Sequence, residues 1–332
     1  MQIIMNSILV VGYGSIGKRH VKNLLKHTNS QIIIYTKRQD LDFKTKRVIV
    51  TNSFEYCLSQ NPNIGFICNE TANHVPMAIK LAKAGLDLFV DKPLSDSMKG
   101  ISTLNKIVKE KKLITQMGCQ LRFHGCIRKM QQLLIQKKIG KIISVQVENG
   151  SYLPDWHPYE DYRKGYAAKK KMGGGVVLTQ IHDIDYLYWF FGNPKSIFSI
   201  TGKFSDLSIS VEDYSASLLQ FKNKITAELH QDFFQGPEYR RCKLKGTDGI
   251  ISWNSINNEI KFYNNRTKKW QIIMKLKNFE KNQMYIDEIK YFLKCVKNRR
   301  KTINNLDDGI NTMNIALAIK KSARHKKIIK IN

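Results

Sequence analysis

A glycine-rich hexapeptide near the N-terminus has the spacing that binds a dinucleotide. Its residues are Gly12, Tyr13, Gly14, Ser15, Ile16 and Gly17. It follows an apolar run predicted as a strand and opens a segment with helical spacing. The first glycine permits the tight turn, the second lets a pyrophosphate approach the backbone, and the third lets helix pack on strand. Because the helix N-terminus presents free N–H groups to the phosphates, we assign all six residues to cofactor binding; a glycine turn without a ligand is the alternative.

The end of the second predicted strand carries Thr36, Lys37 and Arg38. An acidic residue at this distance from the glycine turn would hold the ribose hydroxyls of NAD. A hydroxyl and two cations suit a 2′-phosphate instead. We therefore favour NADP(H) over NAD(H) and assign the three residues to cofactor binding; exposed turn residues are the alternative.

Asp91, Lys92 and Pro93 follow the predicted apolar strand Leu88–Val90 at its carboxyl end. Open α/β sheets place their ligand sites at this edge. We predict that Lys92 points into the site beside the nicotinamide. A solvated loop lysine is the alternative.

The elements needed to position these residues are present in the first third of the chain. Apolar strands rich in Ile and Val alternate there with helical patterns, which predicts a doubly wound parallel sheet covered on both faces. The predicted strands are Ile8–Val11, Ile32–Tyr35, Val48–Val50, Ile64–Cys68, Leu88–Val90 and Leu113–Met117, and the predicted helices are Ile16–Lys26, Phe54–Ser59, Pro76–Ala84 and Met98–Lys109.

The pattern changes after a helix predicted at about Ile127–Gln136. Later strands alternate or carry turn residues between them, as antiparallel strands do, so we predict an α+β domain with a large, open, mostly antiparallel sheet. Its predicted strands are Ile142–Val147, Ile197–Thr201, Ser215–Phe221, Ile225–Gln231, Arg241–Gly246, Gly249–Ser252 and Glu259–Tyr263, and its helices are Val176–Phe191, Tyr285–Lys297 and Ile310–Ser322. The predicted domains are 1–118 and 119–332.

Composition limits the classes of function. The 332 residues suffice for two domains, and 42% hydrophobic residues exclude wholesale disorder. The net charge of +28 comes mostly from scattered Lys, without the Arg-aromatic interleaving of RNA platforms, so we predict no specific nucleic-acid partner. With no run of about 20 apolar residues and no signal-peptide pattern, we predict no membrane partner and a cytoplasmic location. The histidines and cysteines lack metal-ligand spacing, so we predict no metal.

Four motifs in order resemble the Gfo/Idh/MocA oxidoreductases, the family of glucose–fructose oxidoreductase and inositol dehydrogenase. They are Gly12–Gly17, Thr71-Ala72-Asn73-His74, Asp91-Lys92-Pro93, and Gly173-Gly174-Gly175 followed by His182-Asp183-Ile184-Asp185. The resemblance covers nearly the whole chain. Residues 151–158, with Tyr162 and Arg163, are most similar to the branch associated with bacterial surface-polysaccharide genes.

The resemblance implies a Rossmann domain followed by a domain whose open sheet forms homodimers or homotetramers. It implies that Lys92 touches nicotinamide and substrate, and that His182 is the catalytic acid/base. Thr71, Asn73, His74 and Asp91 are implied to lie at the cofactor; the first three match the family's T-P-N-x-x-H pattern only in part, because the histidine comes early.

One departure concerns the partner of His182. Many members carry an aspartate four or three residues before this histidine, where this chain has Leu178 and Thr179. Thr179 can hydrogen-bond an imidazole but cannot stabilise an imidazolium by charge. Asp183 or Asp185 are alternatives for that role, and a substrate-binding or structural role for His182 is the alternative to catalysis.

An aromatic segment between the motifs suits a sugar, because aromatic faces pack on sugar C–H groups and polar tips bond hydroxyls. A cluster that packs a long loop is the alternative. The predicted substrate-binding residues are Gln120, Arg122, Tyr152, Trp156, His157, Tyr162, Arg163, Thr179 and Asp185.

The sequence thus predicts an NAD(P)-dependent oxidoreductase that moves hydride between nicotinamide and a carbinol or keto carbon of a sugar or sugar derivative, nucleotide-linked sugars included. The cofactor supplies the hydride chemistry, and the protein orients the reactants and manages the proton. The alternative is a non-catalytic dinucleotide-binding sensor or scaffold.

Overall fold

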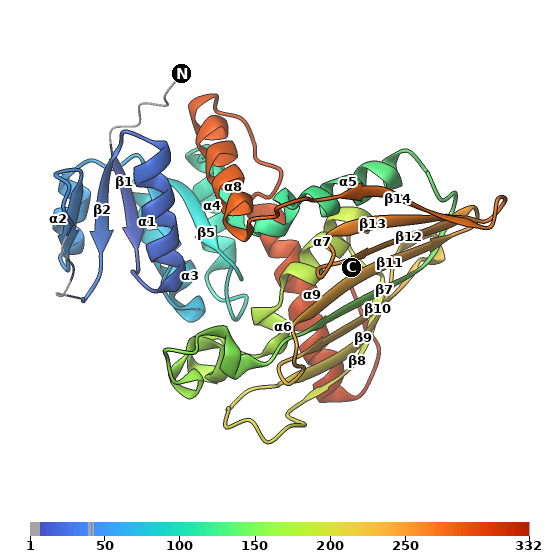
Figure 1. The fold of residues 1–332 in the computed structure, drawn as a ribbon. Helices are drawn as coiled ribbons and strands as arrows, with labels where there is room; N and C mark the ends of the chain where they lie inside the picture. The colour runs from blue at the N-terminus through green and yellow to red at the C-terminus, as the bar shows by residue number, and fades with distance from the viewer. Residues whose placement is uncertain (1–6, 39–40, 42, 332) are drawn as a thin grey trace. The chain divides into compact units, whose positions relative to one another are not determined.

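The computed structural model describes residues 7–38, 41 and 43–331; residues 1–6 and 332 of the predicted domains lie outside that range. The chain folds as two compact units. The first unit comprises residues 1–120 and 281–310, and the second comprises residues 121–280 and 311–332. Figure 1 labels the helices and strands of both units.

The first unit is built on a six-stranded parallel sheet in the order β3-β2-β1-β4-β5-β6, which confirms the predicted doubly wound sheet. Its strands are β1 (Ser7–Val11), β2 (Gln31–Tyr35), β3 (Val48–Thr51), β4 (Ile64–Ile67), β5 (Asp87–Asp91) and β6 (Thr115–Gly118). Its helices are α1 (Ser15–His27), α2 (Phe54–Ser59), η1 (Thr71–Asn73), α3 (His74–Lys83), α4 (Ile101–Glu110) and α8 (Lys281–Lys297).

Apolar residues on both faces of these strands make the sheet a buried layer. Ile8, Val10 and Phe66 belong to the core that α1 and α8 share with one face. On the other face Gly65 leaves room for Leu81 of α3. Strands that are apolar on both sides require helices on both sides, which is why helices alternate with strands here.

Helix α8 makes the first unit discontinuous in sequence. Its apolar residues Ile289, Phe292, Leu293 and Val296 are buried in the same core as the strands. The two units therefore differ from the predicted domains 1–118 and 119–332, because an amphipathic helix far along the chain returns to the first sheet.

The second unit contains a nine-stranded sheet in the order β14-β13-β12-β11-β7-β10-β9-β8-β15. Neighbouring strands are antiparallel except β7 and β10, which are parallel. The strands are β7 (Ile142–Gly150), β8 (Ser196–Gly202), β9 (Tyr214–Gln220), β10 (Thr226–Asp232), β11 (Tyr239–Gly246), β12 (Gly249–Asn254), β13 (Glu259–Asn264), β14 (Lys269–Lys275) and β15 (Ile329–Lys330). The predicted open, mostly antiparallel sheet is confirmed.

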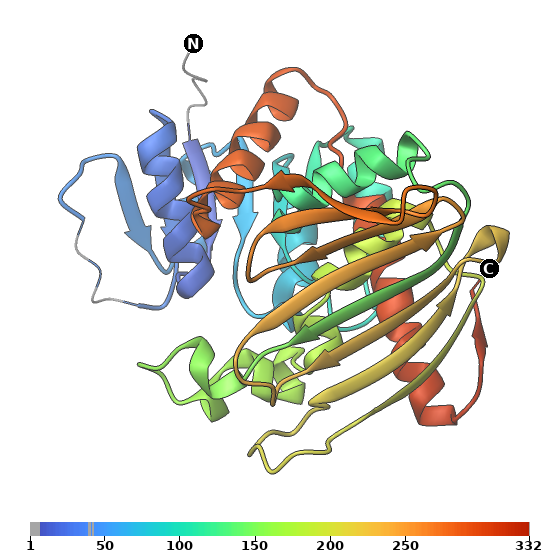
Figure 2. The ribbon, with the colours of Figure 1, turned by 45° about the vertical axis from the view of Figure 1, so that its right-hand side comes forward.

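Helices cover one face of this sheet and leave the other open (Figure 2). They are α5 (Gly125–Ile135), α6 (Val176–Thr179), α7 (His182–Phe191) and α9 (Leu306–His325). Among the described residues, no helix has both the length and the apolar character needed to cross a bilayer.

Two local features differ from the predictions. Strand β14 was not predicted, because most of its side chains are exposed and show no buried face. The single helix predicted over Val176–Phe191 is two helices, because the chain leaves helical geometry at Gln180, with φ −94° and ψ 33°. The second helix therefore begins at His182.

Candidate active site

The glycine turn after β1 has the geometry that its sequence requires. Gly12 has φ +92°, a backbone conformation that favours glycine. A side chain there would meet Asn69 N and Cys68 O at 2.8 Å. Gly17 packs so closely on the carbonyl of Gly12 that a Cβ has no room. The loops after β1 and β4 are thus in direct backbone contact.

The start of α1 has the features of an anion site. Gly14 precedes the helix, no side chain caps the helix, and its first turn carries no acidic residue. A Cβ built on Gly14 would meet no heavy atom within 4 Å, so the space beside it is open. Unpaired N–H groups beside an open backbone fit a pyrophosphate, so the residues present fit a dinucleotide.

The turn after β2 carries the predicted ribose-end residues. The hydroxyl of Thr36 accepts the N–H of Arg38 at 3.3 Å, and the side chains of Lys37 and Arg38 are exposed. Burial raises the pKa of Tyr13, and the Arg38 cation partly offsets this rise. The positive charge of Arg38 therefore acts on the hydroxyl group of Tyr13 in the glycine turn.

Lys92 follows Asp91 at the carboxyl end of β5. The buried Asp91 accepts the backbone N–H of Lys92 on Oδ1 at 2.8 Å. Burial raises the pKa of Asp91, while the charges of Lys92, His74 and Arg19 oppose the rise. The carboxylate thus fixes the turn through its backbone, and three basic side chains act on it.

The segment after β4 distributes its predicted cofactor residues differently. Thr71 is buried, and Asn73 is exposed and donates from Nδ2 to Glu70 at 3.4 Å. Both ring nitrogens of His74 lie at backbone carbonyls, Nδ1 at Pro93 O and Nε2 at Asn69 O. The ring therefore joins two loops, and its predicted place at the cofactor stays a prediction.

Tyr285 is a residue of this neighbourhood that the sequence did not reveal. Its hydroxyl accepts Gln120 Nε2 at 3.0 Å, and the Arg19 guanidinium lies 4.5 Å from its ring centroid. Burial raises the pKa of Tyr285, which the charges of Arg19 and Lys92 oppose. Tyr285 belongs to a helix whose spacing predicts only packing, so no local signal could have found it.

In the second unit, a glycine turn leads to His182. Gly173 and Gly175 have φ +80° and +106°, and a side chain on Gly175 would meet the carboxylate of Glu212. Lys320 of α9 donates to that carboxylate at 2.9 Å. The three-glycine segment is therefore needed for close packing before α6.

His182 is the first residue of α7 and is 5% exposed. Thr179, at the end of α6, is also buried and donates its N–H to Gly175 O at 2.9 Å. In the sequence, the break between the two short helices thus lies between these two predicted site residues.

The two aspartates near His182 are bound elsewhere. Asp183 accepts Asn149 Nδ2 at 2.7 Å and lies 3.3 Å from Arg240 Nε. Burial raises the pKa of Asp183, and Arg240 opposes the rise. These contacts give the carboxylate of Asp183 a structural role on the sheet side of α7.

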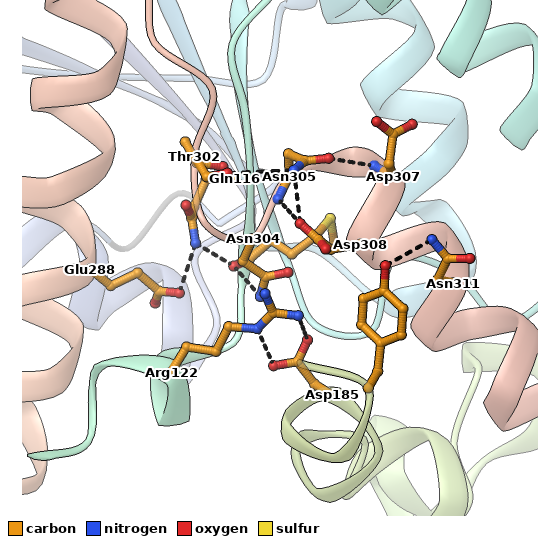
Figure 3. Close-up of polar contacts among 12 residues, drawn as sticks. Gln116, Arg122, Asp185, Glu288, Thr302, Asn304, Asn305, Asp307, Asp308 and Asn311 are labelled. Carbon is orange, nitrogen blue, oxygen red and sulfur yellow. Dashed lines mark hydrogen bonds and ion pairs between the residues drawn. The ribbon is translucent and has the colours of Figure 1, made fainter. Parts of the chain in front are cut away.

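Asp185 forms a buried bidentate pair with Arg122, whose Nε and Nη2 each donate at 2.8 Å (Figure 3). The two side chains are only 2% and 1% exposed. The guanidinium also lies 5.5 Å from the ring centroid of Trp189. The structure makes each residue the partner of the other, because an arginine fork matches a carboxylate. Their predicted binding of substrate stays a prediction.

The aromatic segment is held partly by its own contacts. The N–H of Trp156 bonds Ser151 at 3.0 Å, and Arg163 pairs with Asp161 at 2.8 Å. The hydroxyl of Tyr162 accepts the N–H of Ser208 at 3.2 Å. His157 Nδ1 lies 3.2 Å from the hydroxyl of Tyr159, whereas Tyr152 is 40% exposed. Tyr152 is therefore the most exposed aromatic residue of the predicted set.

Among the residues that the structure describes, no group of three or more His, Cys, Asp or Glu side chains is placed to hold a metal ion. The absence of a metal stays a prediction.

Two family models match this chain, one in each of the two units. The model of the oxidoreductase family with an NAD-binding Rossmann fold matches residues 6–119, and the GFO/IDH/MocA C-terminal domain matches residues 127–252. A myo-inositol 2-dehydrogenase of Thermotoga maritima is 24% identical, over 97% of each chain. A scyllo-inositol 2-dehydrogenase (NAD(+)) of Bacillus subtilis is 22% identical, over 95% of this chain and 93% of that protein.

A solved levoglucosan dehydrogenase in complex with NADH superposes with a TM-score of 0.88 at 16% identity, covering 98% of this chain and 99% of that one. This likeness shows a shared fold. Together with the two family models and the glycine turn built for a dinucleotide, it leads to one conclusion: the chain belongs to the Gfo/Idh/MocA family of oxidoreductases.

Proposed function

We propose that this enzyme moves hydride between a nicotinamide dinucleotide and a carbinol or keto carbon of a sugar or sugar derivative. The observation that carries the proposal is Lys92, held by Asp91 at the carboxyl end of β5 in the unit that has the dinucleotide turn. A bound nicotinamide supplies or accepts the hydride. The protein has to position the carbon and manage the proton of its oxygen.

Lys92 has the role of a cation at the reacting oxygen. During oxidation the carbinol oxygen gains negative charge, and a fixed ammonium group stabilises that charge more in the transition state than in the ground state. The hydrogen bond from the backbone of Lys92 to Asp91 orients the turn that carries the ammonium group.

His182 has the role of acid/base. In oxidation a ring nitrogen takes the proton from the carbinol oxygen, and in reduction it returns that proton. The carboxylates of Asp183 and Asp185 are bound to Asn149, Arg240 and Arg122. We therefore propose that His182 works with Thr179 rather than with either aspartate.

The substrate class follows from the aromatic segment and the relatives. Tyr152, Trp156 and His157 offer ring faces for sugar C–H groups, and Gln120 offers an amide for hydroxyl groups. The related curated proteins include inositol dehydrogenases and a glucose-6-phosphate 3-dehydrogenase. A role with nucleotide-linked sugars in surface-glycan synthesis, and a cytoplasmic location, are further proposals that rest on the sequence alone.

For the cofactor we propose NADP(H), with NAD(H) as the alternative. Thr36, Lys37 and Arg38 supply a hydroxyl and two cations at the ribose end, and no acid. Bidentate arginine suits a phosphate. The structure with NADH in the comparison shares only the fold and does not decide this point.

We also propose that the enzyme is a homodimer or homotetramer through the open face of the nine-stranded sheet. Phe198, Ile200 and Leu218 are 38%, 56% and 49% exposed and line a groove of about 560 Å³ on that face. Apolar patches of this kind mark protein interfaces. Light scattering should give a dimer or tetramer, and Ile200→Asp with Leu218→Lys should give a monomer.

The test of the activity is nicotinamide absorbance with the full-length protein. NADP⁺ and NAD⁺ are each offered with inositols, free sugars, sugar phosphates and nucleotide-linked sugars. At least one substrate should change the absorbance, and Lys92→Met should abolish the change while still binding the dinucleotide. Binding of the dinucleotide with no turnover of any substrate would favour the non-catalytic alternative.

A further inference from the structure

His74 occupies a position between two loops of the first unit. It is the first residue of α3 and is 2% exposed. Nδ1 lies 2.7 Å from the carbonyl oxygen of Pro93, and Nε2 lies 2.9 Å from that of Asn69. Both partners are backbone carbonyls, which accept hydrogen bonds and cannot donate them.

This geometry constrains the protons on the ring. A neutral imidazole has one N–H and one lone pair, so one of its nitrogens would turn a lone pair toward a carbonyl oxygen. An imidazolium has two N–H groups and satisfies both carbonyls. We propose that His74 is a doubly protonated ring that ties the loop after β4 to the Lys92 turn, and so acts as the positioning residue for Lys92.

The charges around the ring support this proposal. Asp91 is the carboxylate that interacts with His74, and Lys92 and Arg19 act on the same carboxylate. The neighbouring thiol of Cys68 has its pKa raised well above its usual value by burial and by Asp91. The imidazolium therefore has an anionic neighbour, and its charge is not left uncompensated by burial.

The proposed reaction requires these two loops to keep a fixed position relative to each other. A Cβ on Gly12 of the dinucleotide turn would lie 2.8 Å from Asn69 N, so the Asn69 backbone is close to that turn. Pro93 directly follows Lys92. A ring that holds both carbonyls fixes the ammonium group relative to the dinucleotide turn. This role rests on the proposed function of Lys92, whereas the protonation of the ring does not.

The protonation is tested without substrate. In the full-length protein labelled with ¹⁵N-histidine, the ring of His74 is identified by its loss in His74→Gln. At neutral pH both ring nitrogens should carry protons. A ring with one unprotonated nitrogen would overturn the proposal, whether or not the enzyme turns over a sugar.

The positioning role is tested by kinetics against a matched control. His74→Gln keeps a donor for only one carbonyl and should lower kcat by about 10- to 100-fold, with the Kd of the dinucleotide unchanged within about threefold. Leu81→Ala removes a buried side chain from the other end of α3; it should lower Tm but leave kcat within about threefold. Equal effects of the two variants on kcat would leave His74 only a structural role.

A spectroscopic measurement keeps this test independent of the activity. Lysine amines are reductively methylated with ¹³C, and the Lys92 resonance is assigned by its loss in Lys92→Met. His74→Gln should shift this resonance, and Leu81→Ala should not. An unmoved resonance would contradict the positioning role even if no substrate were found.

Discussion

Two regions of the first unit bury a histidine, and they treat the ring in opposite ways. His20 of α1 is 1% exposed and lies among Phe66, Phe89 and Tyr285, with ring centroids 5.5, 5.1 and 6.2 Å away. Among the residues that the structure describes, neither of its ring nitrogens has a hydrogen-bond partner. His74 is equally buried, but each of its ring nitrogens lies at a carbonyl.

The difference teaches that the surroundings decide what a buried histidine does. Aromatic neighbours exclude the charged form, and burial lowers the pKa of His20 to about 3. Carbonyl neighbours beside Asp91 favour donation from both nitrogens. The aromatic region therefore contributes stability, and the polar region contributes the position of Lys92.

The largest expected effect is in the polar region. Lys92→Met removes the cation aimed at charge that develops in the transition state, so kcat should fall by about 10³-fold or more. The Kd of the dinucleotide should stay within a few-fold, because the glycine turn is intact. Stopped-flow kinetics and fluorescence titration measure the two quantities. A variant active within tenfold of wild type would assign the polar region a structural role as well.

The next effect sharpens the aromatic region. The unfolded chain protonates His20 below about pH 6.5, whereas the folded chain keeps the ring neutral down to about pH 3. The unfolded state therefore binds more protons between these values, and stability falls as the pH falls through this window. The total loss is on the order of 5 kcal/mol.

Replacing His20 by leucine should remove this contribution. The difference in urea midpoint between wild type and His20→Leu should change steadily from pH 7 to pH 4.5, in favour of the variant at acid pH. Phe89→Leu, in the same cluster, exchanges no proton and should give a difference that is the same at both pH values. A pH-independent difference for His20→Leu would mean that the folded chain protonates the ring over the same pH range as the unfolded chain.

A smaller effect is expected at His182. His182→Ala should lower kcat by roughly 10²-fold, the lower end of what a positioned proton-transfer group contributes, because Asp183 and Asp185 are engaged elsewhere. The variant should also lose one ionisation from the pH–rate profile. An unchanged profile would mean that Lys92 carries out the proton transfer and that His182 binds the sugar.

Local sequence was sufficient for most of the first unit. Strands such as β1 and β4 are apolar on both faces and bounded by turns, and Gly12 needs its positive φ whatever lies elsewhere. Helix α8 shows the limit: its amphipathic spacing predicts a helix but not the sheet on which it packs, because that choice depends on contacts over more than 200 residues of chain.

The candidate site shows the same limit at single residues. Lys92 and the glycine turn lie at the carboxyl ends of parallel strands, where open α/β sheets place their ligand sites. The pairing of Arg122 with Asp185 joins residues 63 apart, so two charges that resemble substrate ligands in sequence are each other's partners in the fold. The sequence does not predict the helix break before His182, because Gln180 and Ile181 continue a helical pattern.

The smallest expected effect concerns the cofactor and lies at the edge of the polar region. In Thr36→Asp with Arg38→Ala, a carboxylate replaces the hydroxyl and one cation is lost. The carboxylate can bond the ribose 2′-hydroxyl of NAD(H) and repels a 2′-phosphate. The preference for NADP(H) should fall by about tenfold, or about 1.4 kcal/mol. Lys46→Ala removes one exposed cation of the same unit outside this turn and should leave the ratio of the two Kd values unchanged. A native enzyme that binds NAD(H) tenfold tighter than NADP(H) would contradict our interpretation of Thr36, Lys37 and Arg38, because two cations at the ribose end should favour the 2′-phosphate.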